Sequence, residues 1–317
     1  MAADSLIVGK EVFRGYRLKQ LLGKGSYGTV WAAENDQGQA VAMKFLPSAD
    51  GTANRLEIRA IQMISELHHP NLTPVHQVWS YKKYFVVAME LADGSMLDLH
   101  DVYQTEYGTP IEPKYLTDLL AQAAGALDFL NARQHTVDGM KVSIQHCDIK
   151  PSNLLLFGDT VKLADFGLSA STNVPVKLHR AVGTPAYMAP EVMQGRLSDW
   201  SDQFSLGVTY TYLRTGKLPW NEKVMSETYL VAPPDLTILP ERERPIVGRA
   251  LATVPQDRWK SCMEMIEQLA EIHNTPAGVY RPRSTQQGTA PVYQAKPTAH
   301  GGNSTTHHGT PKPKYGW

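Results

Sequence analysis

Residues 146–153 read HCDIKPSN, and residues 165–167 read DFG. Working outward from this stretch, residues 183–191 read GTPAYMAPE on its C-terminal side. On its N-terminal side, residues 41–44 read VAMK and residues 23–30 read GKGSYGTV. Chance does not explain so many short motifs in this order and at this spacing. They decide how the rest of the chain is interpreted.

The glycine-rich stretch alone is compatible with two kinds of nucleotide site. A dinucleotide-binding fold places a helix directly after the glycines. Here residues 29–35 read TVWAAEN, which alternates like a strand, and a turn follows at residues 36–38. The glycines therefore lie in a predicted β-hairpin, where missing side chains let backbone N–H groups approach phosphates. A plain glycine-rich turn is the alternative.

The first part of the chain is rich in predicted strands, and the second part in predicted helices. A small β-rich part followed by a larger helical part indicates the α+β class rather than alternating βαβ units. The expected strands cover residues 16–22, 29–35, 39–46, 72–79 and 84–91, and the expected helices cover residues 53–67, 115–132 and 202–216.

The motifs resemble those of the protein kinase catalytic domain, serine/threonine class, over residues 16 to about 272. The resemblance extends to bacterial kinases of the eukaryotic type. It implies a bilobal fold, with a small antiparallel β-rich N-lobe holding one helix, a larger mainly helical C-lobe, and an ATP cleft between them. We expect an N-terminal extension over 1–15 and a kinase domain over 16–274. Its N-lobe would cover about 16–91 and its C-lobe about 93–274.

The same resemblance implies transfer of the γ-phosphate of Mg-ATP to protein serine or threonine hydroxyls, with autophosphorylation. Phosphoryl transfer needs positioning and charge neutralisation. Asp148 would accept the proton of the substrate hydroxyl, and Lys150 would meet the γ-phosphate. Asn153 and Asp165 would hold Mg²⁺, which prefers hard oxygen ligands. A lysine at 150 together with Thr184 is typical of serine/threonine kinases.

Lys44 would contact the α- and β-phosphates and pair with a glutamate of the predicted helix. Glu57 is the candidate, although it follows Lys44 unusually closely and lies far before Pro70. A shorter loop and an extra helical turn would reconcile this spacing. A solvated helix charge is the alternative. The rival function is a pseudokinase, but such proteins usually lose residues of the Lys44, Asp148 or Asp165 type.

Further residues take their roles from the register that the motifs set. The ATP-binding residues would be Leu22, Gly23, Gly25, Gly28, Val30, Ala42, Lys44, Met89, Glu90, Ala92 and Leu155. Structural roles would fall to His146, Phe166, Glu191, Asp202 and Arg258. Asp202 would anchor the backbone of the catalytic loop, and Arg258 would pair with Glu191.

Cys147 stands where many kinases carry an arginine that binds a phosphorylated activation segment. We therefore hypothesise that activity does not depend on phosphorylation of that segment. A small buried residue is favoured over a redox switch. Candidate autophosphorylation sites are Ser169, Ser171, Thr172 and Thr184. Residues 131–145 form a long link that predicts a surface hairpin or loop without assigned chemistry.

The composition of the chain restricts its expected partners, cysteine chemistry and location in the cell. The 317 residues carry a formal net charge of zero, yet residues 275–317 contain no Asp or Glu and read as a disordered basic tail. We expect no nucleic-acid binding. Cys147 and Cys262 lack the spacing of a zinc site or a disulfide framework. No apolar run reaches the length of a membrane span, so a cytoplasmic protein is expected.

Overall fold

The computed structural model describes two compact units within residues 6–273. The first unit holds the described residues up to 47 together with 75–93, and the second holds residues 65–74 and 94–273. The helix expected over 53–67 lies almost entirely outside the described residues, as does the tail. The described segments are residues 6–13, 15–25, 28–47, 65–137, 139–166, 170–171, 183–220 and 233–273.

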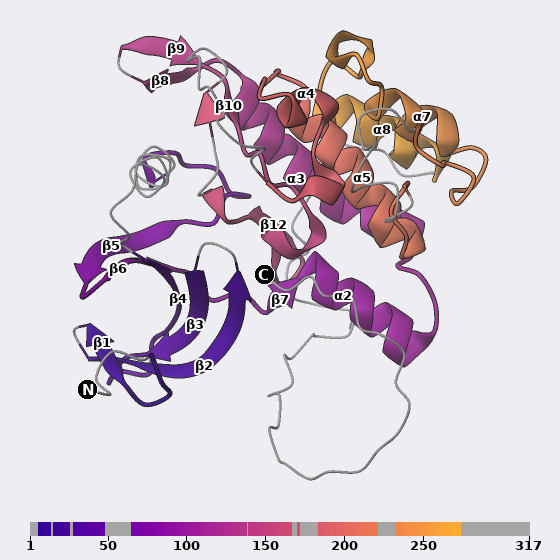
Figure 1. Ribbon diagram of the computed structural model, residues 1–317. Helices are drawn as coiled ribbons and strands as arrows, with labels where there is room; N and C mark the ends of the chain where they lie inside the picture. The colour runs from indigo at the N-terminus through magenta and orange to yellow at the C-terminus, as the bar shows by residue number, and fades with distance from the viewer. Residues whose placement is uncertain are drawn as a thin grey trace. The chain divides into compact units, whose positions relative to one another are not determined.

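The first unit is a six-stranded antiparallel sheet in the order β1-β2-β3-β4-β6-β5. Its core is formed by inward side chains such as Leu18, Met43 and Phe45. The curvature of the sheet is visible in Figure 1. The strands are β1 (Glu11–Phe13), β2 (Tyr16–Gly25), β3 (Gly28–Glu34), β4 (Ala40–Pro47), β5 (Val75–Tyr81) and β6 (Tyr84–Met89).

Strand β1 lies within the segment expected to be an N-terminal extension. It pairs with β2, where Glu11 is opposite Arg17. The ring of Phe13, on this edge strand, stacks on Trp79 of the opposite edge strand β5, with centroids 4.4 Å apart. This aromatic contact joins the two edge strands of the sheet.

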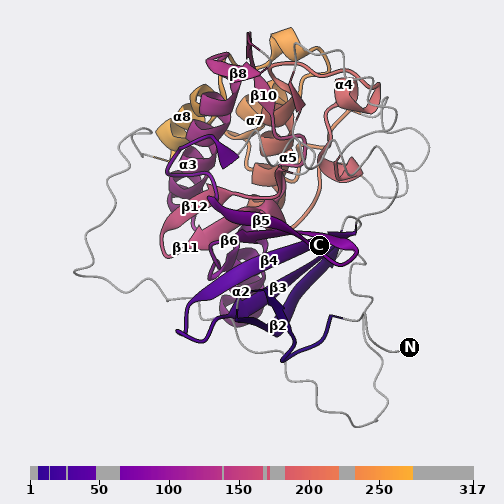
Figure 2. The same cartoon turned by 90° about the vertical axis from the view of Figure 1, so that its left-hand side faces the viewer.

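The second unit is mainly helical and contains three small sheets, in the orders β12-β11-β7, β10-β13 and β8-β9. Figure 2 shows β11 and β12 beside α3, and Gln122 of α3 accepts a hydrogen bond from the backbone N–H of Val161. Its helices are α2 (Met96–Val102), η1 (Tyr103–Tyr107), α3 (Pro113–Asn131), η2 (Pro151–Asn153), η4 (Pro185–Tyr187), α4 (Pro190–Met193), α5 (Ser201–Thr215), α7 (Arg244–Ala250), η5 (Pro255–Asp257) and α8 (Cys262–Ile272). Its strands are β7 (Gly94–Ser95), β8 (His135–Val137), β9 (Met140–Val142), β10 (Ile144–Gln145), β11 (Leu154–Phe157), β12 (Thr160–Leu163) and β13 (Ala170–Ser171).

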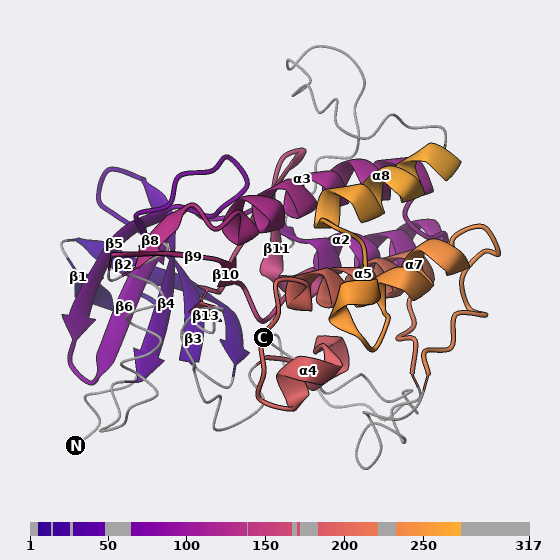
Figure 3. The ribbon, with the colours of Figure 1, turned by 90° about the horizontal axis from the view of Figure 1, so that it is seen from above.

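Helix α3 is the central helix of this unit. Both its N-terminal capping residues and the spacing of its apolar residues suit a buried helix. The carboxylate of Glu112 caps its first turn by accepting from the N–H groups of Lys114 and Tyr115, and Pro113 occupies the first helical position. Leucines and alanines at helical spacing then form a buried stripe. Helix α8 packs alongside α3, as Figure 3 shows.

The predicted α+β class, with an antiparallel sheet and a mainly helical part, is confirmed. Within the link at 131–145, for which a surface hairpin or loop was predicted, residues 135–142 form the β8–β9 hairpin, whereas residues 143–145 are buried. Strand β5 begins at Val75, three residues later than expected. Among the described residues, no helix combines the length and the apolarity that crossing a bilayer requires.

Asp128 of α3 supports the start of α8 by accepting from the backbone N–H groups of Cys262 (2.8 Å) and Met263 (2.9 Å). Burial raises the pKa of Asp128, and these hydrogen bonds oppose that rise. We predict that Asp128→Ala destabilises the protein by about 1–3 kcal/mol, because two buried donors lose their acceptor. The measurement is the shift of the urea unfolding midpoint.

Asp118→Ala is the matched control, since Asp118 forms an exposed ion pair with Lys114 on the same helix. Such pairs contribute about 0.3–0.5 kcal/mol. Equal midpoint shifts for the two variants would contradict the assignment of Asp128 as a cap.

Candidate active site

Asp148 is the centre of a dense set of polar contacts in the second unit, and its residue is only 8% exposed. Its Oδ1 accepts from the backbone N–H of Thr184 (2.9 Å) and from the Thr184 hydroxyl (2.8 Å). Its Oδ2 accepts from the amide of Asn153 (2.9 Å) and lies 3.0 Å from Lys150 Nζ. These contacts use the four acceptor positions of a carboxylate and fix its orientation.

Lys150 completes a triangle with Asp148 and Thr184. Its Nζ donates to the Thr184 hydroxyl at 2.8 Å, and that hydroxyl donates onward to Asp148. Gly183 permits the close approach of this segment, because it has φ +114° and a Cβ there would overlap the carbonyl oxygen of Cys147. A proton acceptor, a cation and an aliphatic hydroxyl therefore lie in mutual contact.

A backbone hydrogen bond joins the segment that contains Asn153 to the segment that contains Asp165. The N–H of Ala164 donates to the carbonyl oxygen of Asn153 at 3.0 Å, directly before Asp165, which has a left-handed backbone (φ 66°). Nε2 of His146 donates to the carbonyl oxygen of Ala164 at 2.9 Å, and its ring packs against Phe166 with centroids 4.7 Å apart. Asp148 N–H donates to His146 Nδ1 at 3.3 Å, which fixes this tautomer.

Asp202 of α5 holds the backbone that precedes Asp148. Its carboxylate accepts from the N–H groups of His146 (2.5 Å) and Cys147 (2.9 Å). Burial raises the pKa of Asp202, and the hydrogen bonds from these two N–H groups oppose that rise. Hydrogen-bond donors to both oxygens favour the ionised form of this carboxylate.

Cys147 is buried and has a left-handed backbone (φ 69°). Its thiol donates to the carbonyl oxygen of Gln145 at 3.6 Å. The side chain is too short and lacks the charge needed to bind a phosphate in the manner of a guanidinium.

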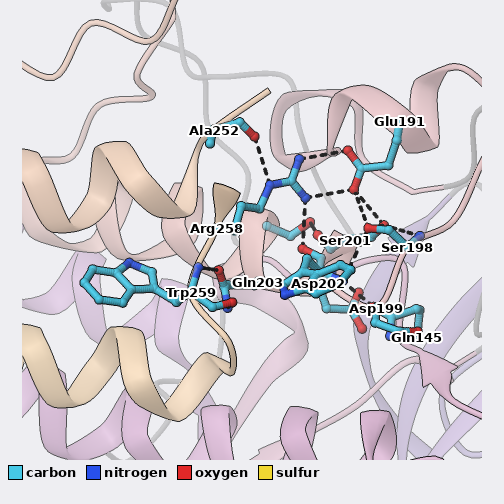
Figure 4. Close-up of polar contacts among 12 residues, drawn as sticks. Gln145, Glu191, Ser198, Asp199, Ser201, Asp202, Gln203, Ala252, Arg258 and Trp259 are labelled. Atoms are coloured by element: carbon cyan, nitrogen blue, oxygen red, sulfur yellow. Dashed lines mark hydrogen bonds and ion pairs between the residues drawn. The ribbon is translucent and has the colours of Figure 1, made fainter. Parts of the chain in front are cut away.

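Glu191 and Arg258 form a buried bidentate ion pair, with both N–O distances at 2.8 Å (Figure 4). The hydroxyls of Ser198 and Ser201 also donate to Glu191, each at 2.9 Å. Arg258, 2% exposed, donates further to the carbonyl oxygens of Ala252 and Trp200. The pair thus joins the segment after Thr184 to α5 and to the segment before α8.

The first unit groups several of the residues predicted to bind ATP on neighbouring strands. Lys44, which is buried, lies opposite Val30 of β3, and Ala42 lies opposite Met89 of β6. Ala42 and Lys44 are two residues apart on β4, so these four positions share one face of the sheet.

The predicted glycine hairpin is present. Gly23 pairs with Val30 and Gly25 with Gly28, and a Cβ on Gly28 would overlap the carbonyl oxygen of Phe45. Leu22 precedes Gly23 on β2, Glu90 and Ala92 follow β6 and are half-buried, and Leu155 lies in β11 of the second unit, opposite Ser95.

The remaining predicted residues are Glu57 and those of the activation segment. Glu57, Ser169 and Thr172 lie outside the described residues. Ser171 is described by its backbone, which belongs to β13 and pairs with Ile144 of β10. Thr184 contacts Asp148 and Lys150 as above.

The sequence interpretation missed two groups of polar residues beside the site. Ser198 and Ser201 supplement Arg258 around Glu191. Asn131, Ser143 and Gln145 form a hydrogen-bond network directly before residues 146–148, in the segment to which no chemistry was assigned. The only signal in the sequence was the presence of polar residues directly before His146.

Comparison with known proteins gives a consistent family. Residues 16–272 match the protein kinase domain family. PTI1-like tyrosine-protein kinase 3 of Arabidopsis thaliana is 29% identical over 262 residues, covering 80% of this chain and 60% of that protein. Serine/threonine-protein kinase PknF of Mycobacterium tuberculosis is 28% identical over 277 residues, covering 81% and 56%.

A solved structure of a kinase domain is also similar to this chain. The crystal structure of the PknI kinase domain of Mycobacterium tuberculosis superposes with a TM-score of 0.66 at 26% identity. The match covers 85% of this chain and 100% of that domain. The chain spans less than two thirds of the length of the two curated relatives.

The Glu191–Arg258 pair predicts how stability depends on pH. Burial raises the pKa of Glu191, but the hydrogen bonds and charge of Arg258 outweigh it and hold the pKa below its usual value of 4.5. The contribution of this carboxylate is therefore present above pH 4.5 and is lost as the pH falls through the lower folded pKa. Arg258→Met should destabilise the protein by about 3–5 kcal/mol at neutral pH, because it leaves a buried unpaired charge.

This difference should shrink as the pH approaches and passes 4.5, because the variant loses the charge and hydrogen bonds of Arg258, which lower the pKa of Glu191, and its carboxyl becomes protonated more readily. The measurement is urea unfolding of both proteins across pH 4 to 7. Arg249→Met, which removes an exposed arginine stacked on Trp259, is the control. A destabilisation by Arg258→Met that is constant across this range would contradict the assignment.

Proposed function

This chain belongs to the protein kinase domain family, and we propose that it transfers the γ-phosphate of ATP to serine and threonine hydroxyls of protein substrates, including its own. The observation that carries this proposal is the contact triangle of Asp148, Lys150 and Thr184. It supplies a proton acceptor and a cation within hydrogen-bond reach of one aliphatic hydroxyl, which is what transfer to such a hydroxyl requires.

The same triangle supports serine and threonine over tyrosine as acceptors. The names of the two relatives differ on this point, since one is called a tyrosine kinase and the other a serine/threonine kinase. In this chain the short hydroxyl of Thr184 already bridges Asp148 and Lys150. A substrate hydroxyl on a side chain of similar length would need the same two partners.

The proposed reaction is a direct displacement at the γ-phosphorus of ATP. The substrate oxygen forms a bond to phosphorus as the bond to the ADP oxygen breaks, and the hydroxyl proton moves to a carboxylate oxygen of Asp148. For this step Asp148 must exchange one of its present donors, and the Thr184 hydroxyl is the one that a substrate hydroxyl resembles. Lys150 balances the negative charge on the transferred group.

The residues that would hold Mg-ATP fit that group chemically. Asn153 and Asp165 offer hard oxygen donors, and the metal would supply neutralisation of the phosphate charge. In the glycine hairpin between β2 and β3, the missing side chains would let backbone N–H groups approach the phosphates. Lys44, with Glu57 as its proposed partner, would contact the α- and β-phosphates. Leu22, Val30, Ala42, Met89 and Leu155 would contact adenine, with backbone groups of Glu90 and Ala92.

We also propose a cytoplasmic location. Both cysteines, Cys147 and Cys262, are free and buried, which suits a reducing compartment. ATP and protein substrates are available there.

The decisive measurement is transfer of labelled γ-phosphate from Mg-ATP to the protein itself and to a generic basic substrate. Asp148→Asn and Asp165→Asn should each lower the rate by about a hundredfold or more, because they remove the proton acceptor and a metal ligand. Asp159→Asn, which alters an exposed aspartate in the turn between β11 and β12, should retain wild-type activity.

Label should appear on serine or threonine. Measurable ATP binding without any transfer by the wild-type protein would instead support the scaffold role of a pseudokinase.

Cys147 generates a second prediction about activity. Because this position offers a thiol that donates to the carbonyl oxygen of Gln145, no guanidinium is present there to bind a phosphorylated activation segment. Phosphatase treatment, checked by intact mass, should leave kcat unchanged within about twofold. Loss of activity on treatment, with recovery after re-phosphorylation, would refute this independence.

A further inference from the structure

Gln145 is a buried glutamine in β10, directly before the catalytic loop, and is 1% exposed. Burying a side-chain amide without hydrogen-bond partners costs free energy, so a buried glutamine must be hydrogen-bonded to its neighbours. Gln145 lies where several segments meet, and its hydrogen bonds therefore join these segments.

The amide is held in one orientation by polar neighbours on both sides. Its Nε2 donates to Asn131 Oδ1 (3.1 Å) and to Ser143 Oγ (3.3 Å). Ser143 in turn donates to the same Asn131 oxygen at 2.5 Å, and Asn131 donates to the carbonyl oxygen of Asp199 at 2.7 Å. This arrangement directs Oε1 of Gln145 toward the start of α5.

There the Gln145 oxygen accepts from the backbone N–H of Asp202 at 3.3 Å (Figure 4). That N–H lies in the first turn of α5, where backbone donors have no partner within the helix. The N-cap residue Trp200 provides no side-chain cap. Gln145 therefore caps α5 from a distant part of the chain.

The cap is reciprocal. Asp202, whose N–H binds Gln145, uses its carboxylate to accept from the N–H groups of His146 and Cys147, the two residues that follow Gln145. The side chain of Gln145 thus binds the backbone of Asp202, and the side chain of Asp202 binds the backbone of the two residues after Gln145. The arrangement resembles a capping box, but it joins residues far apart in sequence. The next residue along the chain is Asp148.

We propose that Gln145 is a positioning residue for Asp148, acting through this reciprocal cap and oriented by Asn131 and Ser143. This inference rests on the proposed role of Asp148 in phosphoryl transfer. The backbone of Gln145 also pairs with Ala170, and its carbonyl oxygen accepts the Cys147 thiol. The uncharged side chains of Gln145, Ser143 and Asn131 thereby support the Asp202 carboxylate in ordering the loop around Cys147, the position at which other kinases carry an arginine.

The neighbouring helix residue Gln203 offers a matched comparison. It is 2% exposed and equally well bonded, but it joins α5 to the segment before α8. Its amide donates to the carbonyl oxygens of Trp259 (3.0 Å) and Ser261 (2.8 Å) and accepts from the N–H of Trp259 (2.9 Å). A buried glutamine with a purely structural role should behave like Gln203.

The test compares Gln145→Met with Gln203→Met, which replace an amide by an apolar side chain of similar length. Both should lower the melting temperature. Gln145→Met alone should lower kcat per folded molecule by about tenfold to a hundredfold, because a small displacement of Asp148 suffices. Its KM for ATP should stay within about twofold of wild type. Equal effects of the two variants on kcat, or wild-type kcat for Gln145→Met, would overturn the proposal.

Amide hydrogen exchange of the peptide containing residues 146–148 provides a second readout that needs no catalysis. It should accelerate by about tenfold in Gln145→Met and remain unchanged in Gln203→Met. If Gln145→Met does not fold, Ser143→Ala, which removes one hydroxyl from the network, decides by the same two readouts.

The two proposals fail differently. Wild-type transfer abolished by Asp148→Asn, combined with unchanged exchange and kcat in Gln145→Met, would reject only the positioning role. Absence of wild-type transfer would reject the proposed function, and the exchange data would still decide whether Gln145 orders the loop.

Discussion

The geometry of the active site depends on the hydrogen bonds that the carboxylate of Asp202 accepts from the backbone. This carboxylate lies in the helical core, where burial raises its pKa, and it remains compatible with ionisation because two backbone N–H groups bind its oxygens. These N–H groups belong to residues 146 and 147, so the anchor is applied immediately before Asp148. The His146 ring in turn donates to the carbonyl oxygen of Ala164 and packs against Phe166, and these contacts fix the segment that carries Asp165.

The ion pair of Glu191 and Arg258 has a different kind of role. A buried ion pair contributes little net stability when desolvation is included, whereas loss of one partner is costly. Its value here is the number of segments that it fixes at once, because four hydroxyl or guanidinium contacts converge on a single carboxylate. It sets the end of the segment that begins at Gly183 and Thr184, and so supports the contact between Thr184 and Asp148.

The sequence predicted the elements whose identity follows from local pattern, such as the glycine hairpin, helices α3 and α5, and the hairpin at 135–142. It also predicted which residues would gather around Asp148, through resemblance to a family, and the roles of those residues stay predictions. It did not predict β1 as part of the sheet. That strand is short, and its contact of Phe13 with Trp79 joins residues far apart in the chain, which no local period can indicate.

The Gln145 network escaped prediction for a more general reason. Residues 142–145 read VSIQ, an alternation that is typical of a strand with one face exposed to solvent. In the structure both faces are buried, because Ser143 and Gln145 face Asn131 and the start of α5. Periodicity reports which residues share a face but not what covers that face. Polar residues on a covered face must find hydrogen-bond partners, and here the partners are the residues that hold the catalytic loop.

The Gln145 amide, the Ser143 hydroxyl and the Asn131 amide carry no net charge. The ordering of the loop by these groups is therefore insensitive to salt screening, unlike ordering by exposed charges.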